Sequence, residues 1–182
     1  MRKTVEDAFK EVLKLVLFTH RTENYHVLLT PNLKEVVGYV GTGCFDSEVD
    51  EERETVESVW YSAAKKGYGP LMYDIAMAES TTKRGKWLCC KDLTSTTQAK
   101  NIWNFYYHNR VGVDVQKKDL VSRRQEHLGE FIGIGSCYKE LFLPDSSVLM
   151  VENISQPQTD VDLNKIRRMA DKFFSERFHG AN

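Results

Sequence analysis

The alternation of apolar and polar positions predicts a chain that begins and ends with helices and carries strands between them. After Thr4, whose side chain can cap a helix together with Asp7, apolar residues recur every three or four positions. This spacing predicts a first helix within residues 1–18 that lays one face on a sheet. The same period returns near the end and predicts an added C-terminal helix over about 160–178. Its apolar face consists of Leu163, Ile166, Met169, Ala170, Phe173 and Phe174.

Between these helices, short β-rich runs are separated by turn residues and polar segments. The predicted strands cover about residues 25–29, 36–45, a run beginning at 56, 86–92, 130–143 and 147–153. Two further helices are predicted over about 69–80 and 95–109. The acidic stretch 46–54 reads as an exposed hairpin loop, and 112–129 as a loop with helical turns. Helices that alternate with strands around a mixed sheet indicate a layered α/β or α+β fold.

Length and composition are those of one domain covering residues 1–182. The chain has a formal net charge of −1, with 41% hydrophobic and 28% charged residues. This hydrophobic content is enough for a core, and the charge balance argues against a general nucleic-acid binder, which would carry a basic excess. No apolar run reaches membrane-spanning length, so we expect no membrane association and a cytoplasmic location.

The cysteines and histidines indicate neither a disulfide framework nor a metal site. Cys44, Cys89, Cys90 and Cys137 form no Cys-x-x-Cys pair, and we expect buried thiols in a reducing compartment. The five histidines are scattered without the spacing of metal ligands. The sequence therefore predicts no metal cofactor.

The pair of glycines at Gly67 and Gly69 stands between a β-rich run and an amphipathic helix. Such a turn directs backbone N–H groups and the positive end of the helix dipole toward one place, where an anion such as pyrophosphate can bind. We expect both glycines to face the ligand across bare backbone, where a Cβ would hold it away. Pro70 follows instead of the Lys of a Walker loop, and the third glycine of a dinucleotide fingerprint is missing. An ordinary loop remains the alternative.

The order of elements around this turn resembles the GNAT acyltransferase family, whose signature is Arg/Gln-x-x-Gly-x-Gly/Ala between the fourth strand and the next helix. The corresponding residues here run from Ala64 to Gly69. Residues 86–92 are similar to the family's fifth strand, and 95–107 to the helix after it. The similarity covers roughly residues 36–110, with an acyl-CoA-binding core at 56–110, and is strongest to GNAT-type proteins of tailed bacteriophages. Ala64 departs from the signature and removes a side chain that usually braces the loop.

The resemblance implies a mixed, mostly antiparallel central sheet flanked by helices, and acetyl-CoA or another acyl-CoA as cosubstrate. The pyrophosphate would lie on the amides of the glycine loop, with help from its lysines, and the pantetheine arm along the fourth strand, where it separates from the fifth. The implied contacts are Val59, Trp60, Tyr61, Lys65, Lys66, Gly67, Tyr68, Gly69, Pro70 and Leu71. For each lysine, a solvated loop position is the alternative.

Acyl transfer to an amine requires a base for the amine and an acid for the leaving thiolate. Glu57 is the candidate base, because partial burial beside Val59 would raise its carboxyl pKa. The alternative is that Glu57 is the exposed side of an alternating strand. Trp103 stands at the position where the family commonly has its acid, a tyrosine. Tyr106 and Tyr107 follow one turn later and are candidate acids, with core packing as the alternative.

Two functions are therefore open. The first is an acyl-CoA-dependent N-acyltransferase that acts on a primary amine of a small molecule, a nucleic-acid base or a protein lysine. The second is a GNAT-fold protein with little or no catalysis, which acts by binding a host or viral partner. A viral origin would place it in the cytoplasm of a bacterial host, and a homodimer is left open.

Overall fold

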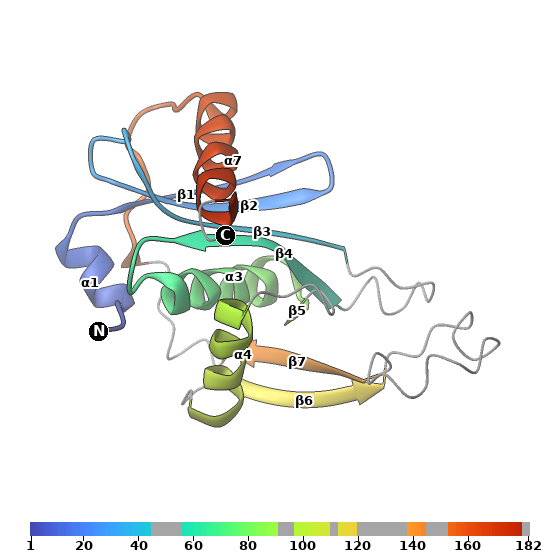
Figure 1. Ribbon diagram of the computed structural model, residues 1–182. Coiled ribbons are helices and arrows are strands. Elements are labelled where there is room, and N and C mark those ends of the chain that lie inside the picture. The colour runs from blue at the N-terminus through green and yellow to red at the C-terminus, as the bar shows by residue number, and fades with distance from the viewer. Residues whose placement is uncertain (45–55, 91–96, 110–112, 120–137, 145–152, 180–182) are drawn as a thin grey trace.

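A computed structural model describes residues 1–44, 56–90, 97–109, 113–119, 138–144 and 153–179 (Figure 1). In chain order the elements are α1 (Val5–Lys10), β1 (Lys14–His20), β2 (Glu23–Leu29), β3 (Val36–Cys44), β4 (Val56–Ala64), α3 (Gly69–Arg84), β5 (Trp87–Cys90), α4 (Thr97–Asn109), β6 (Val113–Asp119), β7 (Tyr138–Pro144) and α7 (Leu163–His179).

The strands form one sheet in the order β1-β2-β3-β4-β5-β7-β6. Neighbouring strands are antiparallel except β4 and β5, which are parallel. A parallel pair needs a long crossover, and α3 supplies it between the end of β4 and the start of β5. The predicted fold class, a mixed and mostly antiparallel sheet flanked by helices, is confirmed.

Helices cover both faces of the sheet (Figure 1). One core joins α3 to α1, α4 and the strands, and its centre includes Leu71, Ile75 and Met77, which are fully buried. A second core lies between α7 and the opposite face, where Ile166, Ala170 and Phe173 pack against strand residues. The C-terminal helix is confirmed, and it covers β2, β3 and β4.

The prediction of one long N-terminal helix is wrong. Helix α1 ends at Lys10, Val12 has a positive φ of 54°, and the chain then enters β1. The expected helical face is only partly buried, since Ala8 is buried but Phe9 is 61% and Val12 is 51% exposed. Strand β1 instead pairs with β2 over its whole length, from Lys14↔Leu29 to His20↔Glu23. Backbone pairing with β2, which follows after only two residues, overrides the local helical spacing.

Residues 113–119 form strand β6, which corrects the predicted loop over 112–129. Their polar sequence gave no strand pattern, but β6 lies at the edge of the sheet and pairs only with β7 among the described strands. Charged side chains are typical of such edges. Strand β7 lies largely within the predicted strand 130–143. The acidic stretch 46–54 and nearly all of the predicted strand 147–153 lie outside the described residues.

Two expectations on cysteines and membranes can be compared with the structure. Cys89 is buried as expected, but Cys44 is exposed at the end of β3, which corrects the expectation of a buried thiol there. Cys137 and the side chain of Cys90 lie outside the described part. No helix in that part is both long and apolar enough to cross a membrane.

Candidate functional site

The described pairing of β4 with β5 covers only the first part of β4. Their pairing runs from Val56↔Trp87 to Val59↔Cys90, whereas β4 continues to Ala64 and remains paired with β3. Beyond Val59, the other edge of β4 has no partner strand among the described residues. A strand edge of this kind carries backbone N–H and C=O groups that can pair with an extended ligand.

A β-bulge in the pairing of β3 with β4 lies directly after the last described β4–β5 pair. The β3–β4 register passes from Gly41↔Tyr61 to Thr42↔Val59, so Trp60 has no residue opposite it on β3. The extra residue reverses the alternation of side chains along β4. The Ser62 and Tyr73 hydroxyl oxygens are 3.0 Å apart on the α3 side, while the ring of Tyr61 meets Phe174 of α7 edge-on. Bulges are frequent beside active sites because they redirect the strand and its side chains.

The end of β4 leads through the glycine turn into α3. Tyr68 is the N-cap residue, but its side chain forms no capping hydrogen bond, and the first turn contains no acidic residue. The positive end of the helix dipole is therefore not neutralised by a side chain of this turn. Pro70 lacks an N–H, so Gly69 and Leu71 supply the amides of the first turn.

The two glycines do not present bare backbone on the side where a Cβ would lie, which corrects our expectation. Gly67 has φ of +91°, and a Cβ there would lie 2.7 Å from the carbonyl oxygen of Met1. A Cβ on Gly69 would lie 3.2 Å from Cδ1 of Ile102. The backbone conformation and the contact with Met1 thus require glycine at position 67 whatever ligand the turn binds, whereas at Gly69 the end of the Ile102 side chain would have to shift slightly.

The lysines of the turn differ in their surroundings. Lys65 Nζ lies 2.8 Å from Oε2 of Glu35, in an ion pair at the surface. The backbone N–H of Lys65 donates to the carbonyl oxygen of Val37, which extends the pairing with β3 past Ala64. Lys66 is exposed. Lys65 thus already has an acidic partner at the surface, as the alternative of a loop lysine without a ligand would allow.

Glu57 is buried and fixed by hydrogen bonds, which corrects both expectations for it. It is 2% exposed, on the α3 side of β4, and Arg84 donates to both of its carboxylate oxygens at 2.8–3.1 Å. Ser80 donates to Oε2, and Asn24 Nδ2 donates to Oε1 at 2.7 Å. Burial alone would raise the carboxyl pKa, but the Arg84 and Ser80 hydrogen bonds outweigh it and lower the pKa. The expected raised pKa is therefore wrong.

His26 of β2 adds a further member to the hydrogen-bond network of Glu57 and Arg84. Its ring is completely buried, with Nδ1 3.0 Å from the carbonyl oxygen of Val40 and Nε2 3.4 Å from Nη2 of Arg84. Burial and the neighbouring Arg84 charge lower the pKa of His26 to about 4. The ring is thus neutral near pH 7, with Nδ1–H donating to Val40 and Nε2 facing the guanidinium. Sequence reasoning missed these partners of Glu57; only the spacing of Ser80 and Arg84, one helical turn apart, hinted at a shared face.

Tyr106 is a core residue. Its side chain is 1% exposed, and its hydroxyl oxygen lies 2.6 Å from Oδ1 of Asp74 and 2.7 Å from the carbonyl oxygen of Pro70. Trp103 is also buried and packs edge-on against Tyr73. These contacts attach α4 to the first turns of α3, directly beneath the glycine turn. The side chain of Tyr107 lies outside the described residues.

No protein-family model, no curated protein and no solved structure matches the chain. Within the described residues there is no group of three His, Cys, Asp or Glu side chains placed to hold a metal ion. The site around β4 is therefore described by its own geometry alone: a strand that continues beyond its described pairing with β5, a bulge, and a helix whose first turn has no acidic side chain.

Proposed function

We propose that the protein is an N-acyltransferase that transfers the acyl group of an acyl-CoA, in the first place acetyl-CoA, to a primary amine. The observation that carries this proposal is the stretch of β4 from the bulge at Trp60 to Ala64, which continues beyond the last described β4–β5 pair, Val59↔Cys90. It offers a strand edge beside a bulge, and this edge leads directly into the start of α3. A long ligand with a peptide-like arm at one end and phosphates at the other suits this combination.

In this proposal the pantetheine amides pair with the backbone of Trp60 and Tyr61, whereas Val59, which we also expected to contact the arm, is paired with Cys90 and Thr42. A backbone N–H near Tyr61 polarises the thioester carbonyl, as in an oxyanion hole. The pyrophosphate lies over the turn from Lys65 to Leu71, where the exposed Lys66 adds positive charge. Because the contacts of the arm are backbone contacts, they tolerate variation in side chains. The acceptor is a primary amine on a small molecule, a nucleic-acid base or a protein lysine.

Acetyl-CoA is expected to raise the melting temperature of the protein. A ligand that binds only the folded state stabilises it by mass action, by about 2.7 kcal/mol when its concentration is 100 times the dissociation constant. Differential scanning fluorimetry with acetyl-CoA, and with desulfo-CoA as a non-reactive analogue, measures the shift. An unchanged melting temperature at millimolar concentrations of both ligands would remove the cosubstrate assignment.

The acid that protonates the thiolate is proposed to be Tyr107 or Tyr106. Replacing the acid by Phe should lower kcat on the order of 10²-fold and leave CoA affinity nearly unchanged, since the hydroxyl acts only in the transition state. For Tyr106 a loss of stability is expected as well, because its hydroxyl contacts Asp74 and Pro70. Steady-state kinetics and melting curves of both single variants separate these effects. Full activity in both would exclude the tyrosines as acids.

Glu57 is disfavoured as the base by its surroundings. Its carboxylate is held by Arg84, Ser80 and Asn24, and its pKa is lowered rather than raised. A base must be free to take a proton from the amine. Glu57 can act in this way only if it leaves these donors during the reaction.

The second function, a fold that binds a host or viral partner without catalysis, is favoured by one specific observation. The position expected for the acid is Trp103, which is buried, and the hydroxyl of the next candidate, Tyr106, is engaged inside the core. Isothermal titration with acetyl-CoA followed by turnover assays with a panel of amines distinguishes the two functions. Binding of the ligand without turnover of any amine would support the second.

A further inference from the structure

Residues Met1–Lys3, which precede the N-cap residue Thr4 of α1, lie along the glycine turn, and we call them the N-terminal arm. The backbone N–H of Lys3 donates to the carbonyl oxygen of Gly67 at 3.0 Å. The carbonyl oxygen of Met1 occupies the space next to Gly67 that a side chain would need. The positive φ of Gly67 and the position of the arm therefore fit together: the turn can accept the arm only with glycine at this place.

The arm and α1 also contact Tyr68, the residue that follows Gly67 in the turn, through the carboxylate of Glu11. Lys3 Nζ lies 2.5 Å from Oε1 of Glu11, the C-cap residue of α1, and the hydroxyl of Tyr68 donates to Oε2 of the same carboxylate. Tyr68 is in turn the N-cap residue of α3. One carboxylate thus links the arm to the residue at which α3 begins. Helix α1 is itself anchored, because Ala8 is completely buried in the main core.

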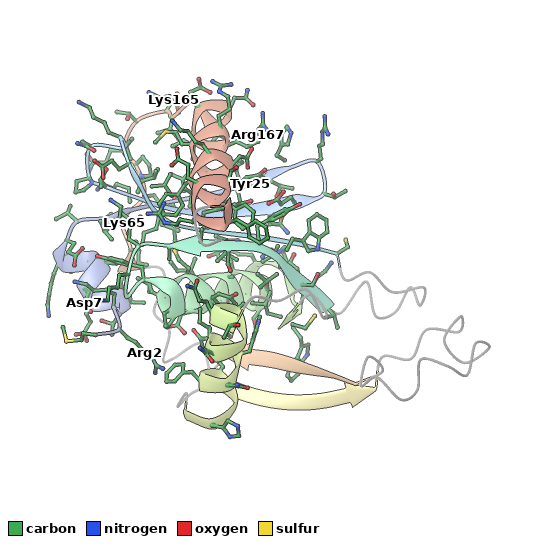
Figure 2. The ribbon with its side chains drawn as sticks, in the orientation of Figure 1. Arg2, Asp7, Tyr25, Lys65, Lys165 and Arg167 are labelled. Carbon is green, nitrogen blue, oxygen red and sulfur yellow. The ribbon has the colours of Figure 1, made fainter. Side chains whose placement is uncertain are left out.

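The arm also reaches across to α4. The guanidinium carbon of Arg2 lies 3.3 Å from the centre of the Phe105 ring, and Figure 2 shows Arg2 directed from the arm toward α4. Helix α4 meets the turn from the other side through Ile102, next to Gly69. The turn is therefore enclosed between the arm and α4. Ala64, where β4 ends, has too short a side chain to support it.

We propose that the N-terminal arm is a positioning element, which holds the Gly67–Gly69 turn in the conformation that presents the amides of α3 to the ligand. The identity of the ligand in this inference, an acyl-CoA, rests on the proposed function. A turn with two glycines has many backbone conformations open to it, and binding must otherwise select one of them. Contacts that order the turn beforehand leave less freedom to be lost when phosphates bind.

A matched pair of substitutions at Lys3 tests the arm. Lys3→Pro removes the N–H that donates to Gly67, whereas Lys3→Ala keeps this N–H; both remove the ammonium group. Amide hydrogen exchange by NMR reports the freedom of Gly67, Tyr68, Gly69 and Leu71 without any ligand. We expect about 3- to 10-fold faster exchange in Lys3→Pro than in Lys3→Ala, the size expected for one hydrogen bond. Melting curves of both variants show whether the fold is retained.

Ligand binding supplies the second measurement, by calorimetry with CoA and with pantetheine, which lacks the pyrophosphate. CoA affinity should fall by a similar factor, about 3- to 10-fold, from Lys3→Ala to Lys3→Pro, with pantetheine affinity unchanged. Glu11→Gln should weaken CoA binding in the same direction, and Lys10→Ala, on the exposed side of α1, serves as its control. An equal loss for CoA and pantetheine would indicate general damage and overturn the inference.

Hydrogen exchange and binding together distinguish this inference from the proposed function. Equal exchange of the turn in Lys3→Pro and Lys3→Ala would overturn the inference, whatever the protein binds. Faster exchange with unchanged CoA affinity would also overturn it, because the conformation of the turn would then not matter for the ligand. If the wild type binds no CoA but exchange in the two variants differs as expected, the arm does order the turn, and the proposed function is wrong.

Discussion

Glu57→Ala should destabilise the protein by about 3–5 kcal/mol, the range found when one partner of a buried ion pair is removed. The alanine leaves the guanidinium of Arg84, which is 25% exposed, without its carboxylate, and it also leaves Ser80 and Asn24 without their acceptor. Because whole domains are stable by only about 5–15 kcal/mol, the variant would be close to unfolding at 25 °C. Urea unfolding followed by circular dichroism measures the loss.

The matched control is a double variant, Glu57→Leu with Arg84→Met, which removes both charges and keeps apolar bulk in the site. We expect it to recover a large part of the stability lost in Glu57→Ala, since no unpaired charge remains buried. The alternative, that Glu57 is needed for catalysis more than for folding, predicts the opposite pattern. Glu57→Ala would then unfold at nearly the same urea concentration as the wild type.

Acidification from pH 7 to pH 4 should reduce the free energy of unfolding through His26 by about 3 kcal/mol. The folded protein holds this ring neutral with a pKa of about 4, while the unfolded chain takes up the proton near the ordinary value of 6.5. Between these two values the unfolded state binds more protons than the folded state, so stability falls as the pH falls. The size follows from about 2.5 pH units at about 1.4 kcal/mol each.

Glu57 adds to the same trend at lower pH. Its pKa is lowered in the folded protein, so its contribution is present above the ordinary carboxyl value of 4.5 and is lost as the pH falls through the folded value. The two groups act in successive windows, His26 first. Urea unfolding at intervals of half a pH unit resolves them.

His26→Asn isolates the histidine, because the shorter amide can still donate to Val40 but does not titrate. The variant should be less stable at pH 7 and show a flatter profile between pH 6.5 and pH 4 than the wild type. His108→Asn, which replaces an exposed histidine on α4, is the control. An equally steep profile in His26→Asn and the wild type would show that another group causes the loss.

Local signals in the sequence were sufficient for the unit on which the proposed function depends. A β-rich run, two glycines and an amphipathic run after them predicted the passage from β4 into α3, and the structure has it at Val56–Ala64 and Gly69–Arg84. The C-terminal helix was predictable for the same reason, since its apolar residues repeat with the helical period. Patterns of this kind act within a few residues, and no distant partner is needed to recognise them.

The tertiary structure decided the features that depend on distant partners. Residues 14–20 are a different case: their apolar positions suit a helix, and pairing with β2, which begins three residues later, makes them a strand. Glu57 finds its donors in Asn24 and Arg84, which are 33 and 27 positions away along the chain. Gly67 was predicted to face a ligand, but the space beside it is taken by Met1 of the arm, 66 positions away along the chain. The sequence by itself thus determined the β4–α3 unit and the C-terminal helix, because their patterns are local. Pairing between strands decided β1 and β6, and the packing of distant segments decided the protonation state and surroundings of the groups at the site.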